Sequence, residues 1–255
     1  MFRSQLRRIR RAARGLRSRK TERLPKVVSL QEFSAAGVSF EISTSAERYR
    51  VLEYAGEKEY LGEMLRYLRA DDVLYDIGAN VGVVALHAAQ ICDVVAFEPD
   101  PSFRARLERN VALNPGTQVR VLPYAASDGD GDVVLYTDGA EGNSPSLRHQ
   151  RGEKDAVTIP GRTIDSLVAS GTLPPPTILK IDIEGAELLA LRGANGLLGS
   201  TGRPRALFIE IHPQFLAAFD GSSEQVEALL RAAGYTRVVY AASRAHETHL
   251  ILEVE

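Results

Sequence analysis

From Asp72 onward, short apolar runs alternate with segments in which apolar residues recur every three or four positions. The short runs predict β-strands, and the longer period predicts amphipathic helices. The predicted strands are Val73–Tyr75, Val94–Phe97, Val119–Leu122, Val133–Tyr136, Ile178–Ile181, Ala206–Ile211, Thr236–Tyr240 and Thr248–Val254. The predicted helices are Val83–Ala89, Pro101–Leu113, Thr163–Ala169, Ala186–Leu198 and Ser223–Ala233. This alternation predicts an α/β fold with a mostly parallel sheet, helices on both faces and an antiparallel hairpin of the last two strands at one edge.

The chain before Asp72 follows another pattern. Gly37–Ser43 alternates between apolar and polar residues, which predicts a strand, and Ala46–Leu68 has the helical period. We therefore expect a leader over residues 1–26, a helical N-terminal extension with one strand over 27–70, and an α/β domain over 71–255.

Composition narrows the class of protein. The chain of 255 residues is 44% hydrophobic and 25% charged, which is typical of a globular protein and excludes wholesale disorder. Its single cysteine, Cys92, excludes a disulfide framework and suits a reducing compartment. No apolar run is long enough to span a membrane, and the N-terminus lacks the apolar core of a secretory signal. These features predict a cytoplasmic location.

Basic residues are concentrated at the N-terminus. Residues 1–26 contain 11 Lys and Arg and one acid, which leaves 20 basic and 32 acidic residues in 27–255. The apolar residues of the leader share one helical face: Phe2, Leu6, Ile9, Ala13 and Leu16. Either residues 1–20 contact an anionic membrane or a partner, or the leader is a solvated basic tail. Nucleic acid is not expected as a partner, because phosphate would repel the acidic body.

The first strand of the domain ends in a turn that suits a ligand. The turn contains, in order, Asp76, Gly78, Ala79, Asn80 and Gly82. Its glycines allow a tight bend into a helix whose first N–H groups are free. The second strand ends in Glu98–Pro99, 20 residues beyond Gly78, the spacing at which an acid accepts both hydroxyls of a ribose. A tight turn without a ligand is the alternative, but the two features together predict a nucleoside-bearing cofactor.

The turn departs from the nicotinamide dinucleotide pattern. That pattern has the spacing Gly-x-Gly-x-x-Gly, and here Asn80 stands in place of the second glycine. Asp76 offers instead a carboxylate that could hold an ammonium group. S-adenosylmethionine carries both a ribose and an ammonium group, so it fits Glu98 at one end and the turn at the other. By position, the adenine should lie near Tyr124–Asp128, a segment that includes Ala126.

Charged side chains also end two later strands. Lys180 and Asp182 end one of them, and Glu210 and His212 end the next. Burying charged side chains at such positions costs free energy, and such residues often have a functional role. These residues are therefore catalytic candidates. In one arrangement, Asp182 or His212 accepts the proton of an acceptor hydroxyl. In the other, Asp182 and Glu210 hold a divalent cation such as Mg²⁺.

We favour the arrangement without metal, because two carboxylates without a third are few ligands for a metal ion. Lys180 is expected to pair with one of the acids. A purely structural role for Glu210 and His212, as hydrogen-bonding groups near Pro213, stays open. His87 is expected in the core, and His149, His246 and His249 have no ligand spacing among them.

Four segments of the chain resemble the FkbM family of S-adenosylmethionine-dependent methyltransferases. They read DIGANVG, VVAFEPDP, ILKIDIEGAELLALRGA and IEIHP, between about Asp72 and Tyr235. The resemblance implies a Rossmann-like, seven-stranded class I methyltransferase sheet and O-methylation of a hydroxyl on a sugar, glycolipid or polyketide-type natural product. By position, it assigns the cofactor motif to Asp76, Gly78, Asn80, Gly82 and Glu98, and a second motif to Lys180, Asp182, Glu184 and Glu187.

The acceptor implied by this resemblance is a small molecule or a glycan. The segment with a suitable set of polar residues to contact it is Glu141–Arg151. Two other function classes stay open. One is a non-catalytic nucleoside-binding partner protein, and the other is an NAD-dependent oxidoreductase on a related sheet.

Overall fold

The computed structural model describes residues 24–139, 144–150, 152–244 and 247–254. The leader of residues 1–20, with the membrane contact predicted for it, lies outside the described residues. Among the helices that are described, none is both long and apolar enough to cross a membrane.

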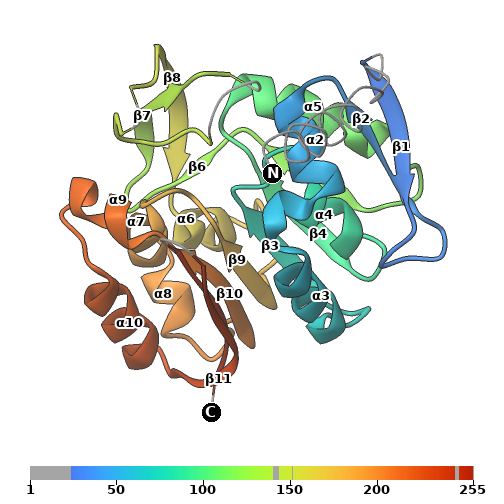
Figure 1. The fold of residues 1–255 in the computed structure, drawn as a ribbon. Coiled ribbons are helices and arrows are strands. Elements are labelled where there is room, and N and C mark those ends of the chain that lie inside the picture. Colours follow the sequence, from blue (N-terminus) through green and yellow to red (C-terminus); the bar gives the residue numbers. More distant parts are fainter. Residues whose placement is uncertain (1–23, 140–143, 151, 245–246, 255) are drawn as a thin grey trace, which may run out of the picture.

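A seven-stranded sheet forms the centre of the described chain (Figure 1). Its order is β11 (Tyr235–Arg244), β12 (Glu247–Val254), β10 (Ala206–Ile211), β9 (Ile178–Ile181), β3 (Val73–Ile77), β4 (Asp93–Phe97) and β5 (Val119–Leu122). The strands from β10 to β5 are parallel, while β12 runs antiparallel to both β10 and β11. The predicted α/β sheet with an antiparallel hairpin at one edge is confirmed, with β12 inserted between β10 and the edge strand β11.

Helices cover both faces of this sheet. Alternate residues of a strand point to opposite faces, so Tyr75 and Ile77 of β3 pack into one core and Leu74 into the other. The first core is closed by α6 (Ile164–Ala169), α7 (Glu187–Arg192), α8 (Asn195–Leu198) and α10 (Ser223–Ala232). The second is closed by α3 (Lys58–Tyr67), α4 (Val83–Ala88) and α5 (Pro101–Ala112). Because helices cover both faces of the sheet, a ligand site is expected at the carboxyl ends of the strands.

Two of the predicted helices are interrupted. Ala46–Leu68 divides into α2 (Ser45–Leu52) and α3, because η1 (Tyr54–Gly56) between them contains left-handed residues, with φ of 52° at Ala55. Ala186–Leu198 divides into α7 and α8 at Gly193, where a Cβ would lie 1.9 Å from the carbonyl oxygen of Ser127. Helical periodicity continues across both breaks, so the pattern of apolar residues does not reveal them.

A separate three-stranded sheet is formed by β6 (Ala125–Ala126), β8 (Asp155–Arg162) and β7 (Gly131–Thr137). The predicted strand Val133–Tyr136 therefore belongs to this small sheet and not to the main one. The sequence pattern does not predict β8, because three of its eight residues are exposed and its apolar alternation is weak. After β10, the chain forms the short α9 (Pro213–Leu216) and η2 (Ala217–Phe219).

The N-terminal extension packs onto the main domain. It begins with an antiparallel pair, β1 (Lys26–Leu30) and β2 (Val38–Ile42), of which β1 is not predicted from the sequence. Two asparagines of the α5 region dock β2: Asn110 Oδ1 accepts the N–H of Glu41, and Asn114 Oδ1 accepts that of Ser39, each at 2.8 Å. The residues that follow, in α2, η1 and α3, form one wall of the space beside the strand ends.

Candidate active site

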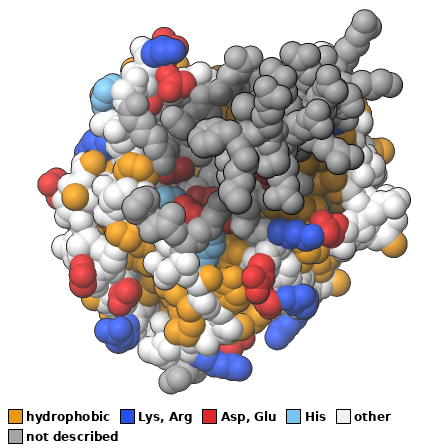
Figure 2. All heavy atoms as spheres, in the orientation of Figure 1, with side chains coloured by type: hydrophobic (Ala, Val, Ile, Leu, Met, Phe, Trp, Pro, Cys, Tyr) orange, Lys and Arg blue, Asp and Glu red, His pale blue; other side chains and the backbone are white. Residues whose placement is uncertain are grey.

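The predicted charged residues meet at the carboxyl ends of β3, β9 and β10. In the register of these strands, Lys180 lies between Asp76 on β3 and Phe208 on β10. Asp182 directly follows β9, and Glu210 precedes His212 by two positions at the end of β10. Figure 2 shows acidic and histidine side chains near the centre of this view of the surface. The two strands that carry these residues are therefore neighbours, as expected.

Two adjoining cavities open at this edge of the sheet. The larger has a volume of about 710 Å³, and its lining includes Arg50, Glu57, Gly78, Asn80, Lys180, Asp182, Glu184, Glu210, His212 and Glu247. The lining of the second includes Gly78, Asn80, Glu98, Pro99, Tyr124, Ala126, Asp182 and Glu184. Because Gly78, Asn80, Asp182 and Glu184 belong to both linings, the two cavities meet at these residues.

The turn after β3 brings its backbone close to β9. Gly78 has a φ of +85°, and a Cβ at this position would lie 1.9 Å from the carbonyl oxygen of Asp182. Gly82, with a φ of +92°, lines neither cavity, and a Cβ there would lie 2.5 Å from the side chain of Leu107. Gly78 and Asn80 therefore shape the junction of the cavities, whereas Gly82 permits the packing of α4 against α5.

Glu98 holds the end of β4 against this turn. Its Oε2 accepts the N–H of Asn80 at 2.7 Å, and its Oε1 accepts the N–H of Asp100 at 2.9 Å. Burial raises the pKa of Glu98 to about 8, although these two backbone hydrogen bonds act in the opposite direction. Glu98 thus places a buried carboxyl group in the second cavity, next to Pro99 and Ala126.

Asp76 lies beneath the site and lines neither cavity. Its side chain is fully buried, and its Oδ1 lies 2.9 Å from Nζ of Lys180. Lys180 also donates to Asp182 Oδ2 and to the carbonyl oxygen of Gly78, each at 3.3 Å. Burial would lower the pKa of Lys180, but Asp76 and Asp182 raise it above its usual value. The Asp76 carboxylate is therefore paired with Lys180, and its contact with the ammonium group of the cofactor stays a prediction from the sequence.

Asp182 is the more accessible of the two acids that line both cavities. Its side chain is 30% exposed, against 14% for that of Glu184. Burial and the Glu210 carboxylate raise the pKa of Asp182 to about 7, against the opposing effects of Lys180 and His212. A carboxylate with these surroundings can accept a proton near neutral pH.

His212 is held between acids at the start of α9. Its Nδ1 donates to Glu187 Oε1 at 2.7 Å, and its Nε2 lies 3.2 Å from Glu210 Oε1. Burial would lower the pKa of His212, but the bonds to Glu187 and Glu210 raise it to about 11. This raised pKa favours the doubly protonated imidazole at neutral pH. This geometry does not support His212 as the group that accepts a proton.

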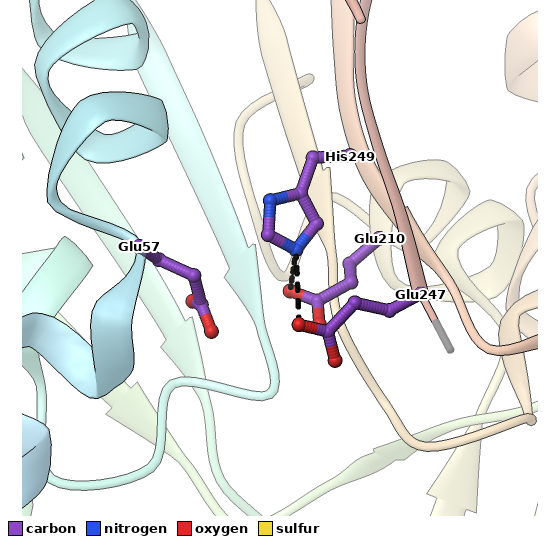
Figure 3. A group of neighbouring side chains, drawn as sticks. All are labelled: Glu57, Glu210, Glu247 and His249. Carbon is purple, nitrogen blue, oxygen red and sulfur yellow. Dashed lines mark ion pairs between the residues drawn. The ribbon is translucent and has the colours of Figure 1, made fainter. Parts of the chain in front are cut away.

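Three further residues join Glu210 in a group that the sequence does not indicate. Glu57, Glu210, Glu247 and His249, here called the carboxylate–histidine cluster, each offer one ligand atom within 4.8 Å of the others (Figure 3). Burial, Glu210 and Asp182 raise the pKa of Glu57 to about 9. In the sequence, Glu57 belongs to an expected helix and His249 has no ligand spacing. The signal that could have found the cluster is the β10–β12 register, which sets Glu210 opposite His249.

A second set of possible metal ligands consists of Asp182, Glu210 and His212, also within 4.8 Å of one another. It contains the Asp182 and Glu210 pair considered from the sequence. In this set, both nitrogens of the imidazole already contact carboxylates.

A family model and two curated relatives match this chain. Residues 76–237 match the model of the methyltransferase FkbM domain. The hexuronic acid methyltransferase AglP of Haloferax volcanii is 32% identical over 183 residues, which cover 72% of this chain and 74% of that protein. The AMB antimetabolite synthetase AmbE of Pseudomonas aeruginosa is 27% identical over 66% of this chain, which corresponds to 10% of that much longer protein.

A solved structure supports the fold. The crystal structure of methyltransferase FkbM from Methylobacillus flagellatus KT has a TM-score of 0.50 and 19% identity, over 76% of this chain and 46% of that chain. The family match covers more than half of the chain and includes the turn after β3, the end of β9 and the end of β10. The chain belongs to the FkbM family and is an S-adenosylmethionine-dependent methyltransferase.

Proposed function

We propose that this chain methylates a hydroxyl oxygen on a sugar, a glycolipid or a polyketide-type small molecule. The observation that carries the proposal is the junction of two cavities at Asp182, with the Glu98 turn on one side and a polar, larger cavity on the other. A sugar-type acceptor is supported by the name of the relative AglP, a hexuronic acid methyltransferase.

The lining of the second cavity suits the adenosine part of the cofactor. Its buried Glu98 carboxyl group suits a ribose, and Tyr124, Pro99 and Ala126 offer an apolar setting for the adenine. At its other end, Gly78 and Asn80 bring backbone close to the junction with the acceptor cavity. Bound there, S-adenosylmethionine would supply the methyl group from its sulfonium. The chain's own residues have to orient the acceptor and remove its proton.

We assign to Asp182 the role of the general base that accepts the proton of the acceptor hydroxyl. As the acceptor oxygen forms its bond to the methyl carbon, the hydroxyl proton passes to the Asp182 carboxylate. Lys180, held by Asp76 at 2.9 Å, keeps this carboxylate at the junction of the cavities. In the alternative, Asp182 and Glu210 hold Mg²⁺. Calorimetry should then show that the Asp182→Asn variant no longer binds Mg²⁺. Unchanged Mg²⁺ binding by this variant would exclude the alternative.

Replacing Glu98 by alanine is expected to weaken binding of S-adenosylhomocysteine, the demethylated product, by about tenfold or more. The physical reason is that a buried ribose hydroxyl left without its hydrogen-bond partner costs roughly 1–3 kcal/mol. Isothermal titration calorimetry measures the affinity. Glu108→Ala, which removes an exposed acid from α5, is the matched control and should bind as the parent does. Equal affinity in the Glu98 and Glu108 variants would refute the cofactor assignment.

The acceptor can be identified by mass spectrometry of metabolites and glycolipids from cells with and without the gene. We expect one product to lose a CH₂ unit when the gene is absent. Mild alkali then tells which oxygen carries the methyl group, because a methyl ester is hydrolysed and a methyl ether is not. An alkali-stable product supports methylation of a hydroxyl, and an alkali-labile product would show that a carboxylate is the acceptor.

We also propose that residues 1–20 bring this methyltransferase to an anionic membrane surface on the cytoplasmic side. The support is the apolar stripe from Phe2 to Leu16 with arginines around it. Deleting residues 1–20 is expected to abolish co-sedimentation with vesicles that contain anionic lipid, while vesicles of neutral lipid alone should bind neither form. Equal co-sedimentation of the full and shortened chains would contradict the proposal.

A further inference from the structure

The carboxylate–histidine cluster lies on the acceptor side of the site, apart from the Glu98 turn. Glu57 comes from the start of α3, Glu210 from β10, and Glu247 and His249 from β12 (Figure 3). Glu57, Glu210 and Glu247 line the larger cavity. The extension, the centre of the sheet and the C-terminal hairpin thus each contribute a side chain to one small space.

His249 is the residue that points to a ligand. It is 3% exposed, and within the described chain its Nε2 has no hydrogen-bond partner. Figure 3 shows this nitrogen directed at the carboxylates of Glu210 and Glu247. The nearest oxygens, Glu210 Oε2 and Glu247 Oε1, lie at 3.4 and 3.6 Å, too far for a strong hydrogen bond.

These separations suit two ligands of one metal ion. Nitrogen and oxygen ligands held tetrahedrally at about 2.1 Å from a metal lie about 3.4 Å from each other. The imidazole is also fixed in position, since its ring stacks on Tyr60 with centroids 4.7 Å apart. Tyr60 is in turn anchored by a hydrogen bond from its hydroxyl to the carbonyl oxygen of Leu250 at 3.0 Å.

The cluster sets carboxyl oxygens beside one buried imidazole, and both kinds of group are ligands of divalent transition metals. The two nearby cationic groups contact other acids: Lys180 contacts Asp76 and Asp182, and His212 contacts Glu187 and Glu210. Both nitrogens of His212 contact acids, so His249 is the imidazole available for coordination.

We propose that Glu57, Glu210, Glu247 and His249 bind a divalent transition-metal ion beside the acceptor cavity. One imidazole with several carboxylates suits ions such as Mn²⁺ or Zn²⁺, whereas Mg²⁺ and Ca²⁺ favour oxygen ligands alone. Because Glu210 contacts His212 through its other oxygen, the ion would also hold the end of β10 in place. The site lies apart from the cofactor cavity, and it shares Glu210 with the surroundings of Asp182.

The proposal is tested by titrating Mn²⁺ and Zn²⁺ into the chelator-treated full chain by isothermal titration calorimetry. We expect the parent to bind a single ion. Glu57→Gln and Glu247→Gln each replace a carboxyl ligand by an amide at nearly constant volume and should weaken binding by about tenfold or more. Glu59→Gln makes the same replacement at an exposed position of α3 and should leave the affinity unchanged.

Thermal unfolding of the same proteins supplies a second readout. An ion that binds the folded chain raises the unfolding temperature of the parent and of Glu59→Gln, and raises that of the two cluster variants less. S-adenosylhomocysteine should bind all four proteins alike, which separates this site from the cofactor site. Absence of saturable binding by the parent, equal ion binding by all four proteins, or a preference for Mg²⁺ or Ca²⁺ would overturn the proposal.

Discussion

Replacing Asp182 by asparagine is expected to lower kcat for methyl transfer by about 10²–10⁴-fold, the range that general-base groups contribute. The amide keeps the shape of the side chain but cannot accept the hydroxyl proton. Because the backbone of Asp182 approaches Gly78 and its side chain accepts from Lys180, the turn should keep its form in this variant. S-adenosylhomocysteine should therefore bind with nearly unchanged affinity. The measurement is kcat with the identified acceptor, together with calorimetry of the product complex.

Two further variants complete this experiment. Asp132→Asn makes the same chemical change at an exposed position of β7 and should be fully active. His212→Gln keeps a polar side chain beside Glu187 and Glu210, so the loss of kcat should be smaller than in Asp182→Asn. If His212→Gln lost activity while Asp182→Asn kept it, His212 and not Asp182 would be the base.

Replacing Lys180 by methionine is expected to destabilise the fold by about 3–5 kcal/mol, the cost of leaving a buried charge without its partner. Asp76 is fully buried, and the ammonium group of Lys180 lies 2.9 Å from its Oδ1. Methionine fills most of the same volume but supplies no charge. The free energy of unfolding can be measured by urea denaturation followed by circular dichroism.

The double variant Lys180→Met, Asp76→Asn removes both charges and should recover most of the lost stability. Arg66→Met is the matched surface control, because it breaks the exposed pair of Arg66 with Glu63 and should cost less than about 1 kcal/mol. A Lys180→Met variant as stable as Arg66→Met would show that the buried pair does not hold the strand ends together.

The apolar pattern was sufficient for the main sheet. Ile178–Ile181 and Ala206–Ile211 are strands with the predicted bounds, since central strands are buried on both faces and are mostly apolar. The peripheral strands and the helix boundaries were harder to predict from the sequence. β1 alternates between exposed and partly buried residues, and the first half of β8 is mostly exposed. The left-handed Ala55 breaks a helix that the periodicity continues.

Within the site, sequence spacing pointed to Glu98, Gly78 and Asp182, because each ends a strand of a parallel sheet or follows one directly. It also placed Asp76 at the correct strand end but could not show that its side chain turns inward to Lys180. Side-chain direction depends on which neighbour supplies the opposite charge, and that neighbour comes from another strand, about 100 positions away in the chain.

The sequence by itself determined the fold class, the family and the strand ends at which the chemistry occurs, because these follow from local periodicity and short motifs. Only the tertiary structure decided that His212 is flanked by acids on both nitrogens and that Glu57, Glu210, Glu247 and His249 converge. The physical reason is that β12 is inserted antiparallel beside β10, which sets His249 opposite Glu210. The interruption after α2 then lets Glu57 face them from the other side, and neither event leaves a local pattern along the chain.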